Sequence, residues 1–266
     1  MTSGGTCVSV LVFSGLDPSG GAGMAADLAA IAAHGVHALP IITALTVQDQ
    51  NRVYGVEPVD SAMLVRQADA LTGALRIDAV KIGIPGSGAN AEVIARIIAR
   101  LREKNPRLPV VLDPVLASGH GDALAVGDAR AALAPLLALA TLVVPNLAEA
   151  AALDCSPCPH VLVTGGHGDG PFVINRYLGA GHGHHDRLWR WPRLPGQFHG
   201  SGCTLAAAIA ARLALGDDIG AALGAAQAFV HATLAGAYSI GPGQRIPRRI
   251  QSWTPSLDPE PGIDRW

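Results

Sequence analysis

The sequence predicts an α/β fold of three layers (αβα), in which a mostly parallel central sheet lies between two layers of helices. Along most of the 266 residues, short β-rich runs alternate with longer Ala/Leu-rich amphipathic runs. The strand-like runs are apolar almost throughout, which is typical of parallel strands buried on both faces. Alternation of such strands with helices predicts helices on both sides of the sheet. The hydrophobic fraction of 49% is sufficient for a large core.

Seven short runs rich in β-branched and other apolar residues predict the strands of this sheet. They lie at residues 8–13, 38–43, 53–56, 79–83, 110–113, 142–144 and 161–164. Two further runs, residues 172–178 and 187–191, flank the Gly- and His-rich tract 179–185 and predict a β-hairpin.

Longer runs with apolar residues at helical spacing predict seven helices. They lie at residues 24–34, 62–75, 91–103, 128–139, 147–153, 202–215 and 219–238. The composition shifts only near residue 242, after which Pro, Arg and Asp become frequent. We therefore expect one domain, residues 1–243, and a loosely held tail, residues 244–266. The arginines of this tail are expected to form a solvated basic patch: Arg245, Arg248 and Arg249.

Charge and composition argue against several classes of partner. The net charge of −2 and the isoelectric point near 6.5 disfavour nucleic acid or an anionic membrane. Only Lys81 and Lys104 are lysines, so a phosphate site must use arginine, backbone amides or a metal ion. Four cysteines in a chain of this length do not indicate a disulfide framework, and the first residues lack the basic start of a signal peptide. The longest uncharged apolar stretch, residues 131–144, is too short to span a bilayer, so we expect a cytoplasmic protein.

A glycine-rich segment, residues 199–205, directly precedes an apolar helical run. Gly200, Ser201 and Gly202 leave backbone N–H groups uncovered where the helix begins, and these donors and the helix dipole predict an anion pocket. Cys203 at this position is expected to have a lowered pKa and to be partly thiolate near neutral pH, which suits a base. The alternative is a glycine-rich helix start with Cys203 as buried filler.

In parallel α/β sheets, ligands bind beyond the carboxyl ends of the strands. Polar residues and glycines, together with Ile84, gather at those ends in this sequence and predict the rim of an active site. They are Ser14, Gly15, Asp17, Gln48, Ile84, Asp113, Asn146, Glu149, Gly165, Gly166 and His167.

Seven short motifs, in order along residues 8–243, carry a family resemblance. They are residues 17–23 (DPSGGAG) with 26–28 (ADL), 42–45 (ITAL) with Gln48, 81–83 (KIG), 111–115 (VLDPV), 145–150 (PNLAEA), 165–167 (GGH) and 200–205 (GSGCTL). On these motifs the chain resembles the hydroxymethylpyrimidine/phosphomethylpyrimidine kinases, thiamine-pathway enzymes of the ribokinase-like superfamily. The resemblance implies a ribokinase-like fold. It also implies ATP- and Mg²⁺-dependent phosphorylation of 4-amino-5-hydroxymethyl-2-methylpyrimidine and of its monophosphate.

The resemblance implies a pyrimidine site in the first half of the chain. Gly15, Ala22 and Gln48 would hold the aminopyrimidine, with the Gln48 amide pairing with a ring nitrogen and the exocyclic amine. Asp27 would help fix the substrate loop. The implied substrate-binding set is Gly15, Asp17, Ala22, Asp27, Gln48 and Ile84.

The resemblance also implies a nucleotide site and a catalytic turn. Asp113 and Glu149 would organise Mg²⁺ through water. The amides of residues 200–202 would bind the transferred phosphoryl group, and Cys203 would stand where related sugar kinases have an aspartate base. The implied catalytic set is Gly200, Ser201, Gly202 and Cys203. The implied nucleotide-binding set is Asn146, Thr164, Gly166 and His167.

The chain departs from the family pattern mainly at the nucleotide site. Only residues 154–160 lie between the Asn-x-x-Glu segment and the Gly-Gly-His strand, so a helix common in the family is missing from the sequence. Thr164 stands where the family has a lysine, which removes a charge that would neutralise phosphate. Ile84 replaces a methionine, and residues 117–121 lack a common lysine.

Other motifs allow alternative interpretations. Cys155 and Cys158, with His160 nearby, could ligate zinc or form a redox pair, but the spacing offers no fourth ligand and favours a simple turn. The histidines of residues 182–185 could bind a metal or cover ATP, whereas such a tract is typical of a solvated loop. His199 would either orient the substrate phosphate or cap its loop.

The sequence disfavours two classes of enzyme and leaves two alternatives to the pyrimidine kinase. The chain lacks a P-loop motif, and an acyl transferase built on Cys203 with His167 or His199 leaves the other motifs unexplained. The alternatives to the pyrimidine kinase are a pyridoxal or pyridoxine kinase and a catalytically weak pyrimidine-binding sensor. By analogy with similar proteins, we expect a homodimer that binds the aminopyrimidine and ATP, without nucleic acid or membrane partners.

Overall fold

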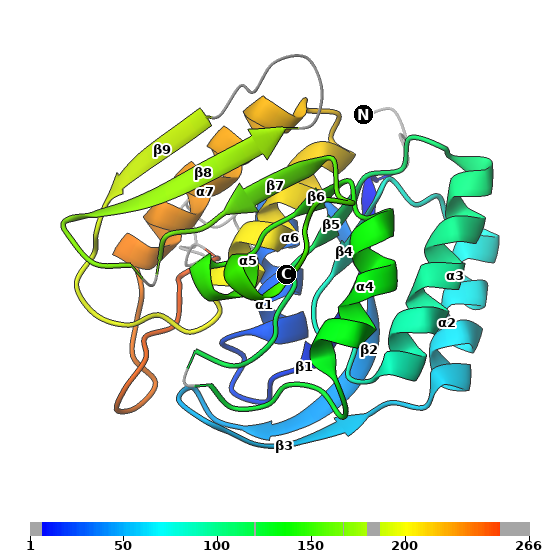
Figure 1. The fold of residues 1–266 in the computed structure, drawn as a ribbon, viewed down its shortest axis with the longest axis horizontal. Coiled ribbons are helices and arrows are strands. Elements are labelled where there is room, and N and C mark those ends of the chain that lie inside the picture. The colour runs from blue at the N-terminus through cyan, green and yellow to red at the C-terminus, as the bar shows by residue number, and fades with distance from the viewer. Residues whose placement is uncertain (1–6, 120, 167, 180–186, 251–266) are drawn as a thin grey trace, which may run out of the picture.

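The computed structural model describes residues 7–119, 121–166, 168–179 and 187–250. Within these residues, one nine-stranded sheet has the strand order β3-β2-β1-β4-β5-β6-β7-β8-β9 (Figure 1). Pairing is parallel from β2 through β1, β4, β5 and β6 to β7, and antiparallel where β3, β8 and β9 extend the two edges. The predicted mostly parallel α/β sheet is confirmed.

The strands lie close to the predicted runs. Their bounds are β1 (Ser9–Leu16), β2 (His37–Gln48), β3 (Val53–Pro58), β4 (Ala79–Ile82), β5 (Val110–Leu112), β6 (Leu142–Val143), β7 (His160–Val163), β8 (Phe172–Gly179) and β9 (Arg187–Pro192). The largest difference from the prediction is in β2, because this strand continues past its parallel partner and pairs with β3 as far as Gln48. Gln48 therefore ends a strand instead of following one.

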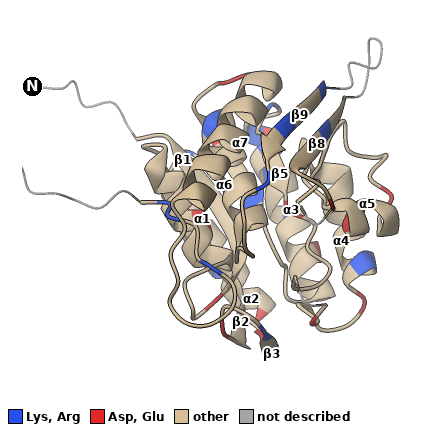
Figure 2. Ribbon diagram, turned by 90° about the vertical axis from the view of Figure 1, so that its left-hand side faces the viewer, with Lys and Arg blue, Asp and Glu red and all other residues tan. Residues whose placement is uncertain are grey.

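Helices cover both faces of the sheet. Their bounds are α1 (Gly23–Ala33), α2 (Ser61–Ala74), α3 (Gly88–Lys104), α4 (Ala129–Leu139), α5 (Leu147–Ala152), α6 (Ser201–Ala214) and α7 (Ile219–Ala235). One buried apolar cluster joins α2, α3 and α4 to the sheet, and a second joins α1, α6 and α7 to its other face (Figure 1). Charged residues are sparse along the ribbon (Figure 2), as the charged fraction of 15% requires. No helix among the described residues has both the length and the hydrophobicity needed to cross a bilayer.

The N-termini of the described helices fall into two kinds. Helices α2, α3, α4, α5 and α7 each begin at a side chain that accepts backbone N–H bonds, namely Asp60, Ser87, Asp128, Asn146 and Asp218. Such caps satisfy donors that would otherwise lack partners. Helices α1 and α6 begin at Ala22 and Gly200 without a side-chain cap. These two uncapped ends belong to segments that meet at one edge of the sheet.

The segment after α7 is integrated into the fold through residue 249. Tyr238 and Ile246 exchange backbone hydrogen bonds of 3.0 and 2.8 Å. Arg249 is only 7% exposed. The expectation of a solvated patch is therefore wrong for Arg249, because its guanidinium finds buried acceptors, whereas Arg248 is exposed as expected. Residues 251–266 lie outside the described residues.

Candidate active site

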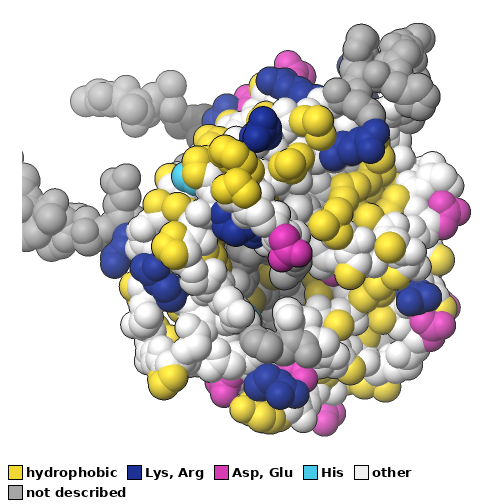
Figure 3. All heavy atoms as spheres, turned by 60° about the vertical axis from the view of Figure 1, so that its left-hand side comes forward, with side chains coloured by type: hydrophobic (Ala, Val, Ile, Leu, Met, Phe, Trp, Pro, Cys, Tyr) yellow, Lys and Arg dark blue, Asp and Glu magenta, His cyan; other side chains and the backbone are white. Residues whose placement is uncertain are grey.

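The carboxyl ends of the parallel strands all lie along the same side of the sheet, across the strand direction, and not at the outer strands β3 and β9. Loop 17–22 follows β1, Ile84 follows β4, Asp113 follows β5 and Asn146 follows β6. The side of the molecule turned forward in Figure 3 is hollowed near its centre, and backbone and polar atoms line much of the hollow. The sequence therefore places its polar loops where α/β proteins bind ligands.

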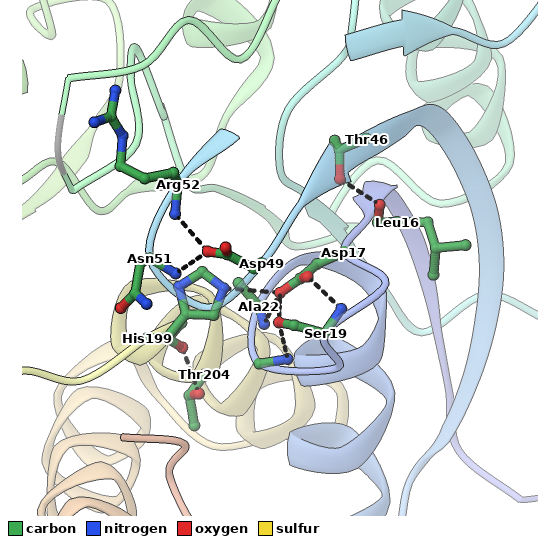
Figure 4. Close-up of polar contacts among 12 residues, drawn as sticks. Leu16, Asp17, Ser19, Ala22, Thr46, Asp49, Asn51, Arg52, His199 and Thr204 are labelled. Atoms are coloured by element: carbon green, nitrogen blue, oxygen red, sulfur yellow. Dashed lines mark hydrogen bonds and ion pairs between the residues drawn. The ribbon is translucent and has the colours of Figure 1, made fainter. Parts of the chain in front are cut away.

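Asp17 organises the loop after β1 (Figure 4). Its Oδ1 accepts a hydrogen bond from the Ser19 amide (2.8 Å), and its Oδ2 accepts from the Ser19 hydroxyl (2.9 Å) and the Ala22 amide (2.7 Å). His199 Nε2 lies 2.8 Å from the same Oδ2. Burial alone would raise the pKa of Asp17, but the hydrogen bonds from His199 and Ser19 lower it below its ordinary value. Asp17 is thus an anion that shapes the loop and joins it to the segment before α6.

Only glycine permits the close approach between this loop and the first turn of α6. Gly200 has a φ of 75°, and a Cβ on Gly200 would overlap the carbonyl oxygen of Gly21. A Cβ on Gly21 would in turn overlap the ring of His199. The glycines of the two motifs therefore bring loop and helix start into backbone contact.

The N-terminal turn of α6 has backbone donors that no N-cap side chain satisfies. Gly200 is its N-cap and offers no side chain, so the N–H groups of Ser201, Gly202 and Cys203 have no intrahelical acceptor. A Cβ on Gly202 would lie 4.0 Å from Asp113 Oδ1, so this turn faces the end of β5. The helix begins as the sequence predicts, and anion binding by its turn stays a prediction.

A buried ion pair lies beneath the site. Lys81 Nζ donates to Asp27 Oδ2 at 2.8 Å, and both side chains are fully buried. Burial raises the pKa of Asp27, although Lys81 opposes this effect. Asp27 was expected among the substrate-binding residues, as a residue that helps fix the substrate loop. Its side chain is fully buried beside Lys81, and its role toward a substrate stays a prediction.

Asp113 and Glu149 form a buried carboxylate pair at the ends of β5 and β6. Burial raises the pKa of Asp113 to about 6 against the opposing effect of Lys81. Burial and the charge of Asp113 raise the pKa of Glu149 to about 7. Glu149 also accepts the Asn146 amide (2.8 Å) in a capping box that holds α5 in place. Two carboxylates that resist ionisation together are suited to a cation or a proton.

Cys203 has a raised pKa, not the lowered one expected from its helix start. Burial and the neighbouring Asp113 carboxylate raise the pKa of the thiol to about 12, and the opposing charge of Lys81 does not reverse this. The prediction of a resting thiolate is therefore wrong, because burial, reinforced by the Asp113 carboxylate, raises the pKa of the thiol. The sulfur has charged neighbours, since Asp113, Lys81 and Asp27 all act on it, so it is not simple apolar filler.

The remaining predicted residues lie in two groups, one at the ends of β1 and β4 and the other at the ends of β6 and β7. A Cβ on Gly15 would lie 2.5 Å from Ile84 Cδ1, so these two residues are neighbours. Thr164 forms a parallel bridge with Asn146, which places both beside the end of β6. The carbonyl oxygen of Gly166 accepts a 2.7 Å hydrogen bond from Arg193. His167 and the histidines of residues 182–185 lie outside the described residues.

The shortened connection before β7 contains no helix, as predicted. Cys158 is buried, and its thiol lies 3.4 Å from the Ala140 carbonyl oxygen and 3.2 Å from that of His160. Cys155 and Cys158 are unbonded to each other. The described residues contain no group of three or more His, Cys, Asp or Glu side chains that could hold a metal ion. A simple turn accounts for this pair of cysteines.

Sequence analysis did not assign two residues, Lys81 and Arg249, to the site. Lys81 was noted within the KIG motif and as one of two lysines, but not as a member of the site, although a lysine within an apolar strand run is a signal of a buried partner. Arg249 was grouped with its neighbours in a polar tail. Its position depends on contacts with residues far away in the chain, for which the sequence holds no local signal.

Solved structures with a similar fold are ribokinase-like kinases of small molecules. A pyridoxal kinase of Bacillus subtilis, solved as an ADP complex, has a TM-score of 0.78 and 25% sequence identity, covering 92% of this chain and 98% of that one. A phosphomethylpyrimidine kinase of Clostridium difficile 630 has a TM-score of 0.69 and 28% identity, covering 84% and 97%. The fold and the strand-end site therefore define a ribokinase-like kinase.

Sequence comparison gives the family. The phosphomethylpyrimidine kinase family model matches residues 17–157 and 153–247, and its two segments meet in the shortened connection before β7. A hydroxymethylpyrimidine/phosphomethylpyrimidine kinase of Rhizobium meliloti (strain 1021) is 38% identical, over 91% of this chain and 97% of the relative. The chain belongs to the phosphomethylpyrimidine kinase family, and the resemblance of its motifs is confirmed.

Proposed function

We propose that the protein transfers the γ-phosphoryl group of ATP to the hydroxymethyl oxygen of 4-amino-5-hydroxymethyl-2-methylpyrimidine, and then phosphorylates the resulting monophosphate. The reaction would take place in the cytoplasm and serve thiamine synthesis. One observation carries the proposal: the uncapped turn of α6, Asp113 and Cys203 lie together at the strand ends. Phosphoryl transfer has a loose transition state, so positioning and charge stabilisation matter more than strong proton abstraction.

The pyrimidine would lie between the loop after β1 and the end of β2. The side chain of Ile84 packs directly against Gly15, and this partly exposed apolar side chain would contact one face of the flat ring. Gln48 ends β2 with its side chain partly exposed and would pair with the ring nitrogen and exocyclic amine. Ala22 and Asp17 would shape the loop around the ring.

The nucleotide would lie across the ends of β6 and β7, beside Asn146, Thr164 and Gly166. Its transferred phosphoryl group would accept hydrogen bonds from the N–H groups of residues 201–203 at the uncapped turn of α6. In the first reaction the thiolate form of Cys203, a small fraction at neutral pH because the pKa of the thiol is about 12, would receive the proton of the attacking hydroxyl. The second reaction needs no such base, because its acceptor is a phosphate oxygen.

Asp113 and Glu149 fit a magnesium ion. Asp113 Oδ2 is buried and has no hydrogen-bond partner among the described residues, so one oxygen is available for a ligand. Carboxylate oxygens are the ligands that Mg²⁺ prefers, and one or two suffice when water and phosphates complete its shell. When bound, Mg²⁺ would neutralise charge that develops on the phosphate oxygens. Asp113 and Glu149 would hold it close to the nucleotide.

A direct assay tests this function. We expect ADP release with ATP, Mg²⁺ and the hydroxymethylpyrimidine, and further release with its monophosphate as acceptor. Pyridoxal is the second candidate acceptor, because the similar structure from Bacillus subtilis is a pyridoxal kinase. Faster turnover of pyridoxal than of the pyrimidine would favour that candidate. If calorimetry shows tight pyrimidine binding and the assay gives no product, the pyrimidine-binding sensor would be favoured. Thr164 and the missing helix are the reasons for considering this alternative.

Magnesium binding is expected to weaken as the pH falls. Both carboxyl groups have raised folded-state pKa values, about 6 for Asp113 and about 7 for Glu149, so they gain protons between pH 8 and pH 5.5. We expect the Mg²⁺ concentration that gives half of the rise in melting temperature to be about 10- to 100-fold higher at pH 5.5 than at pH 8. Asp113→Asn should abolish this rise at both pH values. Equal Mg²⁺ sensitivity at the two pH values would contradict the assignment.

We also propose that the protein is a homodimer. Leu45, Val47 and Tyr54, on β2 and β3, are 50%, 60% and 68% exposed. Exposed apolar side chains at a sheet edge are typical of an interface between subunits. Light scattering should give twice the chain mass of 27.2 kDa, and Val47→Lys with Tyr54→Lys should give a monomer. A monomeric unmodified protein at assay concentrations would refute the dimer.

A further inference from the structure

The segment that follows α7 returns to the active site at Arg249. Its Nε donates to Thr204 Oγ1 at 2.8 Å, and its Nη2 donates to the carbonyl oxygens of Gly21 (2.5 Å) and Gly200 (3.4 Å). Gly21 belongs to the loop after β1, whereas Gly200 and Thr204 belong to the first turn of α6. One buried guanidinium therefore joins the two segments that would enclose the substrate and the transferred phosphoryl group.

The charge of Arg249 has no carboxylate within its hydrogen-bonding reach among the described residues. Its acceptors there are two backbone carbonyl groups and a hydroxyl. The guanidinium also lies at the N-terminal end of α6, where the helix dipole favours anions and disfavours cations. A buried cation at such a place costs free energy in the unliganded protein, and an anion bound in the α6 turn offsets that cost.

Few cations in the chain could supply positive charge at the α6 turn. The chain has only two lysines. Lys81 is fully buried against Asp27, and Lys104 ends α3. Arg249 donates to the carbonyl oxygen of Gly200, the residue directly before the N–H groups at the uncapped turn of α6. It is thus placed to supply positive charge at that turn.

We propose that Arg249 is a positioning residue for phosphoryl transfer, which holds the loop at Gly21 against the α6 turn at Gly200 and favours the phosphoryl group in that turn. The inference rests on the proposed function. It gives the segment after α7 a part in the reaction. It also explains why an arginine, and not an apolar residue, occupies this buried position between Gly21 and Gly200.

Arg248 provides a matched control. It is the preceding residue of the same segment, it is exposed, and its Nε donates to the Gly236 carbonyl oxygen at 3.1 Å. Its guanidinium lies 5.2 Å from the ring centre of Tyr238. Arg248 therefore shares the charge and chain position of Arg249 without touching either segment of the site.

The test compares Arg249→Ala, Arg249→Lys and Arg248→Ala in the full chain. We expect Arg249→Ala to lower kcat by about 10- to 100-fold with a KM for the pyrimidine within about threefold, because the reacting groups lose alignment. Millimolar guanidinium chloride should restore part of this kcat. Arg249→Lys should be intermediate, since an ammonium keeps the charge but not the fork of donors. Arg248→Ala should remain within twofold of the unmodified protein.

Two results would overturn the inference. One is a kcat within twofold of the unmodified protein for Arg249→Ala, or for Arg249→Lys where the alanine variant does not fold. The other is a loss that guanidinium does not restore and that matches the fraction of unfolded protein. Inactivity of the unmodified protein with both pyrimidine acceptors would instead contradict the proposed function, so the two failures are distinguishable.

Discussion

Cys203→Ala is expected to lower kcat for the first phosphorylation by about 10²- to 10³-fold, and kcat for the second by less than about threefold. The first acceptor is a hydroxyl group, whose proton must leave as the new P–O bond forms. The second acceptor is a phosphate oxygen that already carries negative charge. A base at Cys203 therefore assists only the first reaction, and the two acceptors report on it within one protein.

The raised pKa of Cys203 adds a pH dependence to this prediction. Because its thiol has a pKa of about 12 in the unliganded site, the thiolate fraction rises about tenfold per pH unit between pH 7 and pH 9. We expect kcat/KM for the first reaction to rise with pH between pH 8 and pH 9, above the pKa values of Asp113 and Glu149, and that for the second to stay flat over this interval. Cys203→Ala should remove the slope.

An exposed cysteine provides the control for this experiment. Cys7 precedes β1 and is exposed, so Cys7→Ala should leave both reactions unchanged. Initial rates with each acceptor, measured by ADP release between pH 6 and pH 9, give both comparisons. Equal losses in the two reactions of Cys203→Ala would contradict a base and leave the residue a packing role.

The fold was predictable because its signals are local. Buried parallel strands need apolar runs, and the helices between them need apolar residues at helical spacing, so each element is written in its own segment. The end of β2 was not predictable in this way. Gln48 is polar and looks like a loop residue, but it pairs with Val53 of β3, and this pairing extends the strand.

The position of the site was predictable, whereas its electrostatics were not. Strand ends and glycine motifs located Asp113, Glu149 and the α6 turn, because parallel topology brings these ends together. The pKa of Cys203 depends on Asp113 and Lys81, which lie about 90 and 120 positions away in the chain. A helix start alone predicts a lowered pKa, whereas burial of the thiol and the neighbouring Asp113 carboxylate raise it. The position of Arg249 likewise depends on tertiary contacts alone.

Lys81→Met is expected to destabilise the folded protein by about 3–5 kcal/mol, because it leaves the Asp27 carboxylate buried without its partner. The Lys81–Asp27 pair is fully buried, and Asp27 Oδ1 has no hydrogen-bond partner among the described residues. In the variant, Asp27 would have to fold as a neutral acid. Urea unfolding monitored by circular dichroism measures the change, with the exposed Lys104→Met as the control.

The pH dependence identifies the cause of this loss. Burial already raises the pKa of Asp27 in the folded state, and removal of Lys81 raises it further, whereas the unfolded chain keeps the ordinary value of 3.8. Protonation therefore favours the folded variant, and its stability should fall as the pH rises from 5 to 8. Adding Asp27→Leu should recover about 2 kcal/mol or more, since an apolar pair can replace a buried ion pair. A loss below about 1 kcal/mol that is independent of pH would refute this account.

The stable double variant Lys81→Met, Asp27→Leu also tests how the ion pair acts on the site above it. Lys81 lowers the pKa of Asp113, and this effect is larger than the opposite effect of Asp27. Removing both charges should therefore raise the pKa of Asp113 above its present value of about 6. Since Asp113 must be ionised to hold Mg²⁺, the acid limb of kcat/KM for the second reaction, which needs no base at Cys203, should move to higher pH while its activity at pH 9 stays near that of the unmodified protein. An unshifted acid limb would mean that Lys81 and Asp27 support the strand ends by packing alone.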